Sequence, residues 1–322
     1  MIDALGVSDA LQRIGRTAPQ PITALSPTVA ATLERYAASR PSLDTANKYR
    51  IIAKHTINPV LGCVSVAELT VDDVQSWLNG LTIAGRSIVQ AHMLLKAALT
   101  AAIDRGELSI NPARKASRSG GSGVRIPRRP PGKQAVFLSR HEAVLVVAAV
   151  PDRQRVLIEF LLATGCRIGE ALALTPADIG TGTATFNKSY SRRANAAGNR
   201  PFDLGAAKTA ASERTIAVPQ GVLDKLNMSG ALVFTNDTGY AINADSFRKN
   251  VWIPAMAKSG LPKHRRPGLH DLRHTHASRL IDAGISIVAV SKRLGHSNVS
   301  ITLSTYAHVA SDADERILAA LA

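Results

Sequence analysis

Apolar residues in the first third of the chain recur at the spacing of one helical face. They are Ile88, Ala91, Leu94, Leu95, Ala98 and Ala102, and this periodicity predicts an amphipathic helix. Gly106 follows as a stop signal. An earlier helix is predicted to open at Thr70, because Asp72 and Asp73 favour the positive end of a helix dipole. Residues 28–110 as a whole predict four helices.

The second half of the chain opens with a pattern typical of a capped helix. Ser139 and Glu142 have the spacing of a capping box before the apolar run 143–150. Gly165 is predicted to end the next helix, 152–164, and Arg167 to open a third that ends near Leu174. The β-rich runs 183–186 and 214–218 predict a small antiparallel sheet. Further helices are expected at about 243–257, 270–283, 286–294, 298–306 and 312–321. The predicted fold is mainly α with a small antiparallel β-sheet (α+β).

Changes in composition divide the chain into four parts. Residues 1–26 lack core-forming periodicity and end in prolines, which indicates a short N-terminal arm. Residues 27–110 form the predicted helical domain, 111–135 a basic interdomain linker, and 136–322 a second domain. The linker is rich in Gly, Pro and Ser, and has seven basic residues and no acidic one. It could lie along a DNA backbone, where neutralised phosphates release counterions, or be only a solvated tether.

The excess of basic over acidic residues indicates which kind of partner the chain binds. Of 322 residues, 39 are Lys or Arg and 24 are Asp or Glu, so the net charge is +15. An excess of this size suggests a polyanionic partner such as nucleic acid. Cys63 and Cys166 fall in different predicted domains, which argues against a disulfide framework or a zinc site and fits a reducing compartment, here the cytoplasm. We expect no signal peptide and no membrane-spanning segment.

Six side chains in the last half of the chain could together cut a phosphodiester through a covalent tyrosine link. They are Arg167, Lys208, His270, Arg273, His296 and Tyr306. Arginine suits an anionic phosphate because its planar fork donates two parallel hydrogen bonds and keeps its charge. A tyrosine nucleophile needs a base or a positive field, since the reference pKa of a phenol is about 10. The deoxyribose leaving group needs an acid. Because every cation here is a side chain, no metal or other cofactor is required.

The sequence suggests one role for each of these groups. Arg167 and Arg273 would hold the non-bridging phosphate oxygens, with Glu170 orienting Arg167. Tyr306 is the expected nucleophile, and His270 is the base that accepts its proton. Lys208 is the acid, and His296 donates a further hydrogen bond to the phosphate. Two alternatives stay open. Lys188 competes with Lys208 for the role of acid, and His270 with His274, four residues apart, could instead bind a metal.

These residues lie in motifs that resemble those of the tyrosine recombinases, the phage integrases and their relatives. The motifs T-G-x-R-x-x-E, S-x-R-T-I-x-V-P, H-x-x-R, L-G-H and T-Y-x-H correspond to residues 164–170, 212–219, 270–273, 294–296 and 305–308. The lysine of the family precedes the second motif, as Lys208 does here. The resemblance implies a helical core-binding domain and a tyrosine recombinase catalytic domain. It also implies cleavage of double-stranded DNA through a 3′-phosphotyrosyl link, and a homotetramer that exchanges strands at attachment sites.

The resemblance indicates a site-specific DNA recombinase that integrates a phage or another mobile element. Two rivals stay open: a topoisomerase of the 3′-linking tyrosine type, and a DNA-binding relative without activity. The resemblance also implies that the last helix, 312–321, docks on a neighbouring subunit. It leaves open a need for a host bending factor or a directionality factor. Because about 26 residues precede the helical domain, too few for an independent fold, binding of distant arm sites is in doubt.

Overall fold

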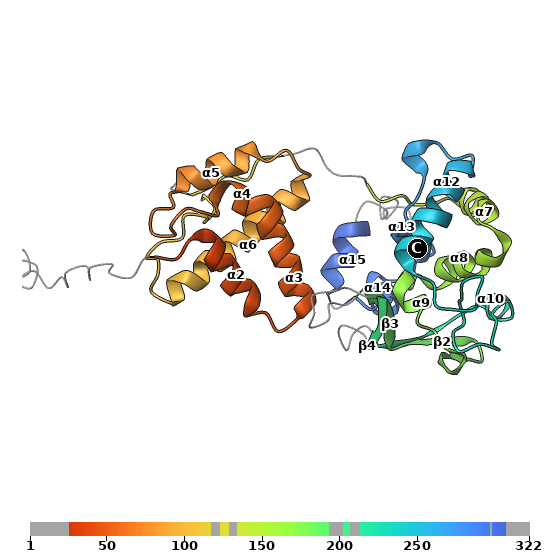
Figure 1. Cartoon of the computed structure of the whole chain (residues 1–322). Helices are drawn as coiled ribbons and strands as arrows, with labels where there is room; N and C mark the ends of the chain where they lie inside the picture. Colours follow the sequence, from red (N-terminus) through yellow and green to blue (C-terminus); the bar gives the residue numbers. More distant parts are fainter. Residues whose placement is uncertain are drawn as a thin grey trace, which may run out of the picture. The chain divides into compact units, whose positions relative to one another are not determined.

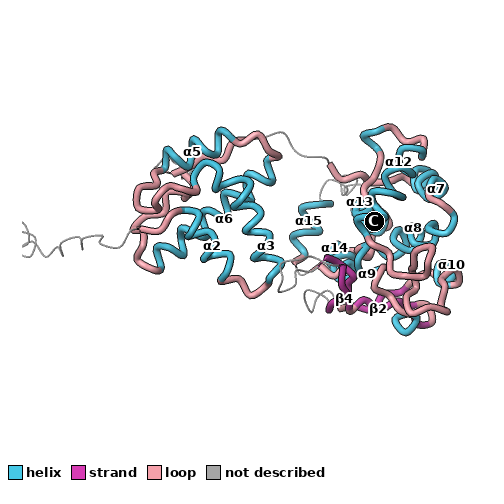
Figure 2. Tube along the Cα trace, in the orientation of Figure 1, coloured by secondary structure: helices cyan, strands magenta, loops and turns pink. Residues whose placement is uncertain are grey.

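The computed structural model describes residues 26–116, 123–128, 134–192, 202–206, 213–296 and 298–306. The chain divides into two compact units, Met1–Gly132 and Lys133–Ala322 (Figure 1). Helices dominate both units, and the strands gather in one part of the second unit (Figure 2). The prediction of a mainly α fold with small antiparallel sheets is therefore confirmed.

The described part of the first unit has five α-helices where the sequence predicts four, because two of them continue one another through a π-helical turn. Its α-helices are α2 Val29–Ala38, α3 Leu43–Ile52, α4 Asn58–Leu61, α5 Val71–Gly80 and α6 Gly85–Asp104, with a π-helical turn η1 Ala53–Ile57 joining α3 to α4. Thr70 caps α5: its hydroxyl accepts from the Asp73 N–H, and the Asp73 carboxylate accepts from the Thr70 N–H. The residues predicted to form the apolar face of α6 are all buried.

Part of the predicted linker belongs to the core of this unit. Ala113 and Val124 are buried among the helices, and a parallel bridge pairs Lys115 with Val124. The buried His92 on α6 contacts the Ala113 carbonyl through Nε2 at 2.8 Å. The expectation of a linker starting at residue 111 is thus corrected, because residues 111–116 and 123–128 pack on the helical unit instead of forming a tether.

The second unit begins with two helices that support the first functional motif. They are α7 Arg140–Ala149 and α8 Asp152–Thr164, followed by the single-turn α9 Ile168–Ala171 and the 3-10 turn η2 Pro176–Asp178. Ser139 and Glu142 form the predicted capping box of α7. Gly165 ends α8 in the left-handed conformation, with φ 65°. The third helix is shorter than predicted, because it ends at Ala171 instead of near Leu174.

The described part of this unit contains two small antiparallel sheets. The first has the strand order β1-β2-β5, and its strands are β1 Ile179–Gly180, β2 Thr183–Phe186 and β5 Arg214–Ala217. The strands expected at 183–186 and 214–218 are therefore confirmed. The second sheet is a hairpin of β3 Lys188–Arg192 and β4 Phe202–Ala206.

The rest of the unit is helical and carries the remaining motifs. Its elements are α10 Gln220–Leu223, α11 Ala244–Phe247, the π turn η4 Arg248–Trp252, α12 Ile253–Lys258, the 3-10 turn η5 Lys263–Arg265, α13 Leu269–Asp282, α14 Ile287–Leu294 and α15 Val299–Tyr306. The predictions near 243–257, 270–283, 286–294 and 298–306 are confirmed to within a residue or two. The helix expected at 312–321 lies outside the described residues. In the described parts of the chain, no helix is both long and apolar enough to cross a membrane.

Candidate active site

Arg167 is held at the start of α9 by its own helix. Its backbone N–H donates to the Glu170 carboxylate at 2.8 Å, and its guanidinium donates to the same carboxylate at 2.7 Å. Glu170 is 5% exposed, whereas the Arg167 side chain is 40% exposed. A buried carboxylate thus fixes the orientation of a guanidinium that stays accessible, which agrees with the role expected for Glu170.

Arg273 is buried at 2% exposure on α13 and joins three parts of the unit. Its two terminal nitrogens donate to the carbonyls of Gly165, at 2.9 Å, and Leu294, at 2.6 Å. Burial, followed by the charge of Arg167, lowers the pKa of Arg273 to about 10. The group therefore stays protonated at neutral pH, and its position is set by two backbone carbonyls.

Gly165 makes this arrangement possible. Its φ of 65° is unfavourable for side chains with a Cβ. A Cβ there would also lie 2.5 Å from the His276 ring and 3.0 Å from the Leu294 side chain. Glycine at this position therefore lets α8, α13 and the end of α14 approach closely enough for Arg273 to bridge them.

His270 lies one turn before Arg273 on the same helix, as the spacing predicts. Asp271 caps this end of α13 by accepting from the Gly268 N–H at 2.7 Å. Burial, then the charges of His274, Arg273 and Arg167, lower the pKa of His270 to about 4. His270 is therefore neutral at pH 7 and able to accept a proton.

His296 comes from a different segment but is affected by the same two arginine charges as His270. It follows Gly295, which ends α14 in the left-handed conformation. Burial, then the charges of Arg273 and Arg167, lower the pKa of His296 to about 4. Its Nδ1 is 2.8 Å from the hydroxyl of Thr302 on α15, which ties the imidazole to the helix that carries Tyr306.

The structure thus brings together four of the six predicted site residues: Arg167, His270, Arg273 and His296. Tyr306 is the last residue of α15, and the position of its side chain lies outside what the structure describes. Lys208 also lies outside the described residues, shortly after β4. Its competitor Lys188 forms an ion pair with Asp178 at 2.7 Å.

Two further arginines, to which the sequence analysis assigned no role, organise this region. Arg214 donates to the Glu170 carboxylate and to the Arg293 carbonyl. Arg293 donates to His276 Nε2 at 3.0 Å, while His276 Nδ1 is 2.9 Å from the Leu162 carbonyl. His276 is therefore the neutral tautomer with its proton on Nδ1, and burial, then the Arg293 charge, lower its pKa to about 4. The one sequence feature that could have pointed to Arg214 is its place in the motif S-x-R-T-I-x-V-P.

The histidines of α13 do not assemble a metal site among the described residues, where no group of three or more His, Cys, Asp and Glu side chains could hold a metal ion. Both ring nitrogens of His276 already contact protein groups. His270 and His274 pack edge to face, with ring centroids 4.9 Å apart. Cys166 is buried, and burial raises the pKa of its thiol to about 12, which agrees with a structural role.

Comparisons with known proteins identify relatives of this chain. Residues 137–312, more than half of the chain, match the phage integrase family. The integrase of Mycobacterium phage L5 is 27% identical over 325 residues, spanning 95% of this chain and 82% of that protein. A tyrosine recombinase XerC-like protein of Caldanaerobacter subterraneus is 28% identical over 274 residues, spanning 73% of this chain and 66% of that protein.

Solved structures share the fold. The Tn1549 transposon integrase in complex with a circular intermediate DNA superposes with a TM-score of 0.73 at 21% identity, over 92% of this chain and all of that one. A lambda integrase tetramer bound to a Holliday junction gives a TM-score of 0.65 at 20% identity, over 91% of this chain and 87% of that one. The chain belongs to the phage integrase family and is a site-specific tyrosine recombinase.

Proposed function

We propose that this recombinase cleaves and rejoins double-stranded DNA at the attachment sites of a phage or similar mobile element, through a 3′-phosphotyrosyl link on Tyr306. The observation that carries the proposal is the convergence of Arg167, Arg273, His270 and His296 from three separate motifs. Positive and protonatable groups gathered in this way favour an anion. A DNA phosphate is the anion that the basic character of the chain, with net charge +15, suits best.

The electrostatics of the free site support a phosphate ligand. The charges of Arg167 and Arg273 lower the pKa values of both histidines, after the larger effect of burial. A phosphate bound between the arginines would offset these charges and raise the pKa of His270. His270 would then become a stronger base in the complex than in the free protein, where its pKa is about 4. Cleavage would thus be coupled to correct binding of the DNA.

The proposed reaction conserves the energy of the phosphodiester. The Tyr306 oxygen attacks the phosphorus and forms a phosphotyrosyl bond, while its proton passes to His270. The bond to the 5′ oxygen breaks, and Lys208 protonates that leaving group. Arg167, Arg273 and His296 hold the non-bridging oxygens during the transfer. The 5′-hydroxyl of a partner strand then attacks the phosphorus and gives its proton to Lys208, while the bond to Tyr306 breaks and the phenol regains its proton from His270. A DNA phosphodiester is restored, so no external energy source is needed.

Assembly on DNA completes the proposal. Lambda integrase has been solved as a tetramer on a Holliday junction, and we infer the same assembly for this chain on two duplexes. The helix predicted at 312–321 would dock on a neighbouring protomer. Recombination would take place in the cytoplasm of a bacterial host, where the DNA lies. The comparisons with integrases favour this function over that of a topoisomerase.

The test begins with a DNA site obtained from the protein itself. A Tyr306→Phe variant, which lacks only the phenol oxygen, is used to select binding sites from a pool of random duplexes. The wild-type protein is then incubated with a supercoiled plasmid that carries two copies of the selected site. We expect recombinant circles, together with DNA covalently linked to protein. Relaxed plasmid without recombinants would support a topoisomerase, and binding without any covalent product would support a non-catalytic relative.

A further inference from the structure

Arg214, at the start of β5, is nearly enclosed, with its side chain 7% exposed. Its guanidinium stacks over the Phe186 ring at 4.7 Å from the ring centroid. Its Nη2 donates to one Glu170 oxygen at 2.9 Å, its Nη1 contacts the other at 3.3 Å, and its Nε donates to the Arg293 carbonyl at 2.7 Å. One planar group therefore holds acceptors from two segments far apart in the sequence.

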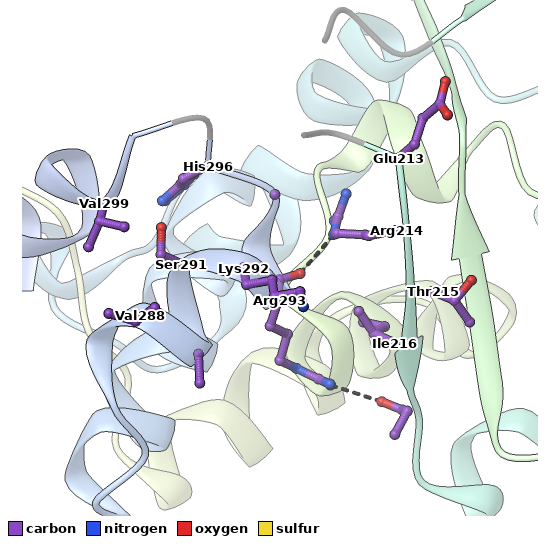
Figure 3. Close-up of a pocket in the computed structure, with 13 residues that line it drawn as sticks. Glu213, Arg214, Thr215, Ile216, Val288, Ser291, Lys292, Arg293, His296 and Val299 are labelled. Carbon is purple, nitrogen blue, oxygen red and sulfur yellow. Dashed lines mark hydrogen bonds between the residues drawn. The ribbon is translucent and has the colours of Figure 1, made fainter. Parts of the chain in front are cut away.

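These acceptors belong to the segments that present the proposed catalytic groups. Glu170 is the carboxylate that also binds Arg167. The Arg293 carbonyl precedes that of Leu294, which accepts from Arg273, so two arginines bind consecutive carbonyls at the end of α14. Figure 3 shows Arg214 on β5 reaching across to the end of α14, beside the turn that leads to His296.

We propose that Arg214 is a positioning residue that fixes Arg167 relative to the turn carrying His296. The inference rests on the proposed function, since it assumes that Arg167 and His296 act on one phosphate. Without Arg214, the Glu170 carboxylate would be free to turn toward Arg167 alone, and the end of α14 would lose one of its two arginine contacts. Arg214 would touch neither DNA nor the reacting atoms.

Arginine is the side chain that this position requires. Three donors in one plane match the two carboxylate oxygens and the carbonyl, a geometry that the single ammonium of lysine cannot reproduce. The carbonyls at the end of α14 also carry the partial negative charge of a helix C-terminus, which a cation stabilises. Since Arg214 lies against an aromatic ring and is almost inaccessible, these contacts persist without competition from water.

Arg214→Lys tests the inference, because it keeps the positive charge but loses the planar fork. Cleavage is measured in a single turnover, at saturating protein, on a nicked duplex of the site selected with Tyr306→Phe. We expect the cleavage rate to fall at least about tenfold, since small misplacements of reacting groups have effects of this size. Affinity for the duplex should change by less than about threefold, because the basic surface stays intact.

A double-mutant cycle separates positioning from a general loss of structure. If Arg214 acts through Arg167, Arg214→Lys should slow the Arg167→Lys variant little further, because coupled residues are non-additive. The matched control is Arg155→Met, which removes an arginine that binds the Ala148 and Val150 carbonyls elsewhere in the same unit. Arg155→Met should slow cleavage only slightly. In combination with Arg167→Lys, the two fold-reductions in the cleavage rate should multiply. Multiplicative effects of Arg214→Lys, or a wild-type cleavage rate, would overturn the inference.

A measurement without DNA keeps this inference distinct from the proposed function. In the ¹H–¹⁵N spectrum of arginine side chains, the Arg167 signal is identified by its loss in Arg167→Lys. It should shift or broaden in Arg214→Lys and stay in place in Arg155→Met. If the wild-type protein forms no covalent product, the proposed function fails, while this spectrum still decides whether Arg214 fixes Arg167. An unchanged Arg167 signal, or a variant that no longer unfolds cooperatively, would mean that Arg214 is only structural.

Discussion

Gly169 is the point where α9 meets the β3–β4 hairpin. A Cβ at this position would lie 2.7 Å from the Ser189 hydroxyl and 2.9 Å from the Tyr190 carbonyl. The hydroxyl can rotate away, but the carbonyl belongs to strand β3, which pairs with β4 over its whole length. Gly169→Ala therefore forces the hairpin away from α9, the helix that begins after Arg167.

The size of the effect follows from two opposing terms. Alanine is favoured over glycine inside a helix by up to about 1 kcal/mol. Overpacking of a close contact destabilises by about 1–3 kcal/mol. We expect a net loss of roughly 1–2 kcal/mol in the free energy of unfolding. Gly221→Ala is the matched control, because Gly221 is also the second residue of a four-residue helix and has nothing within 4 Å of its virtual Cβ. It should leave stability unchanged or raise it.

The assay combines urea unfolding with single-turnover cleavage. Lys208 follows β4 closely, so displacement of the hairpin should misplace the proposed acid. Cleavage by Gly169→Ala should therefore slow even at temperatures where the variant is fully folded. A substrate with sulfur at the 5′-bridging position should recover much of the rate, since a thiolate leaves without an acid. Equal stability and equal cleavage rates for Gly169→Ala and Gly221→Ala would mean that the close contact between Gly169 and β3 limits neither property.

Three further predictions concern charge. Glu170→Gln should destabilise the second unit by about 3–5 kcal/mol, because it leaves the enclosed Arg214 without its anionic partner; a loss below about 1 kcal/mol in urea unfolding would contradict this. Stability should fall as the pH drops from about 6.5 toward 4, because the pKa of His276 is lowered from 6.5 to about 4 and only the unfolded chain takes up the proton in that window. A denaturation midpoint at pH 5 equal to that at pH 7 would count against it. Lys208→Ala should be rescued by the 5′-bridging sulfur and Lys188→Ala should not, and the reverse pattern would transfer the role of acid to Lys188.

Local patterns in the sequence predicted much of the fold. The capping box at Ser139 needs only residues three apart and formed as predicted, and the helix predicted to open at Thr70 does begin there. Gly165 and Gly295 ended their helices because a left-handed residue favours glycine. The spacing of His270 and Arg273 placed both on the first turns of α13.

Contacts between segments far apart in the sequence could not be predicted from such local patterns. Arg214 and Glu170 are 44 residues apart, and neither position has a periodicity that pairs it with the other. Strand β4, Phe202–Ala206, alternates apolar residues with polar or small ones, but β3, Lys188–Arg192, has one aromatic residue, Tyr190, among polar ones, so periodicity alone does not pair the two strands. Residues 111–116 and 123–128 resembled a linker by composition, but their apolar residues Ala113 and Val124 are buried in the core of the helical unit. Composition reports the average of a segment, whereas packing depends on single residues.

In the proposed reaction, Tyr306 becomes covalently linked to the 3′ phosphate of cleaved DNA. The most direct measurement is mass spectrometry of the peptide that contains Tyr306, after incubation with a nicked duplex of the selected site in the presence of EDTA. We expect a nucleotide adduct on Tyr306 in the wild-type protein and none in Tyr306→Phe, with chelator making no difference. An adduct on another residue, an adduct in Tyr306→Phe, or an adduct that forms only when a divalent metal is added would contradict the proposed reaction.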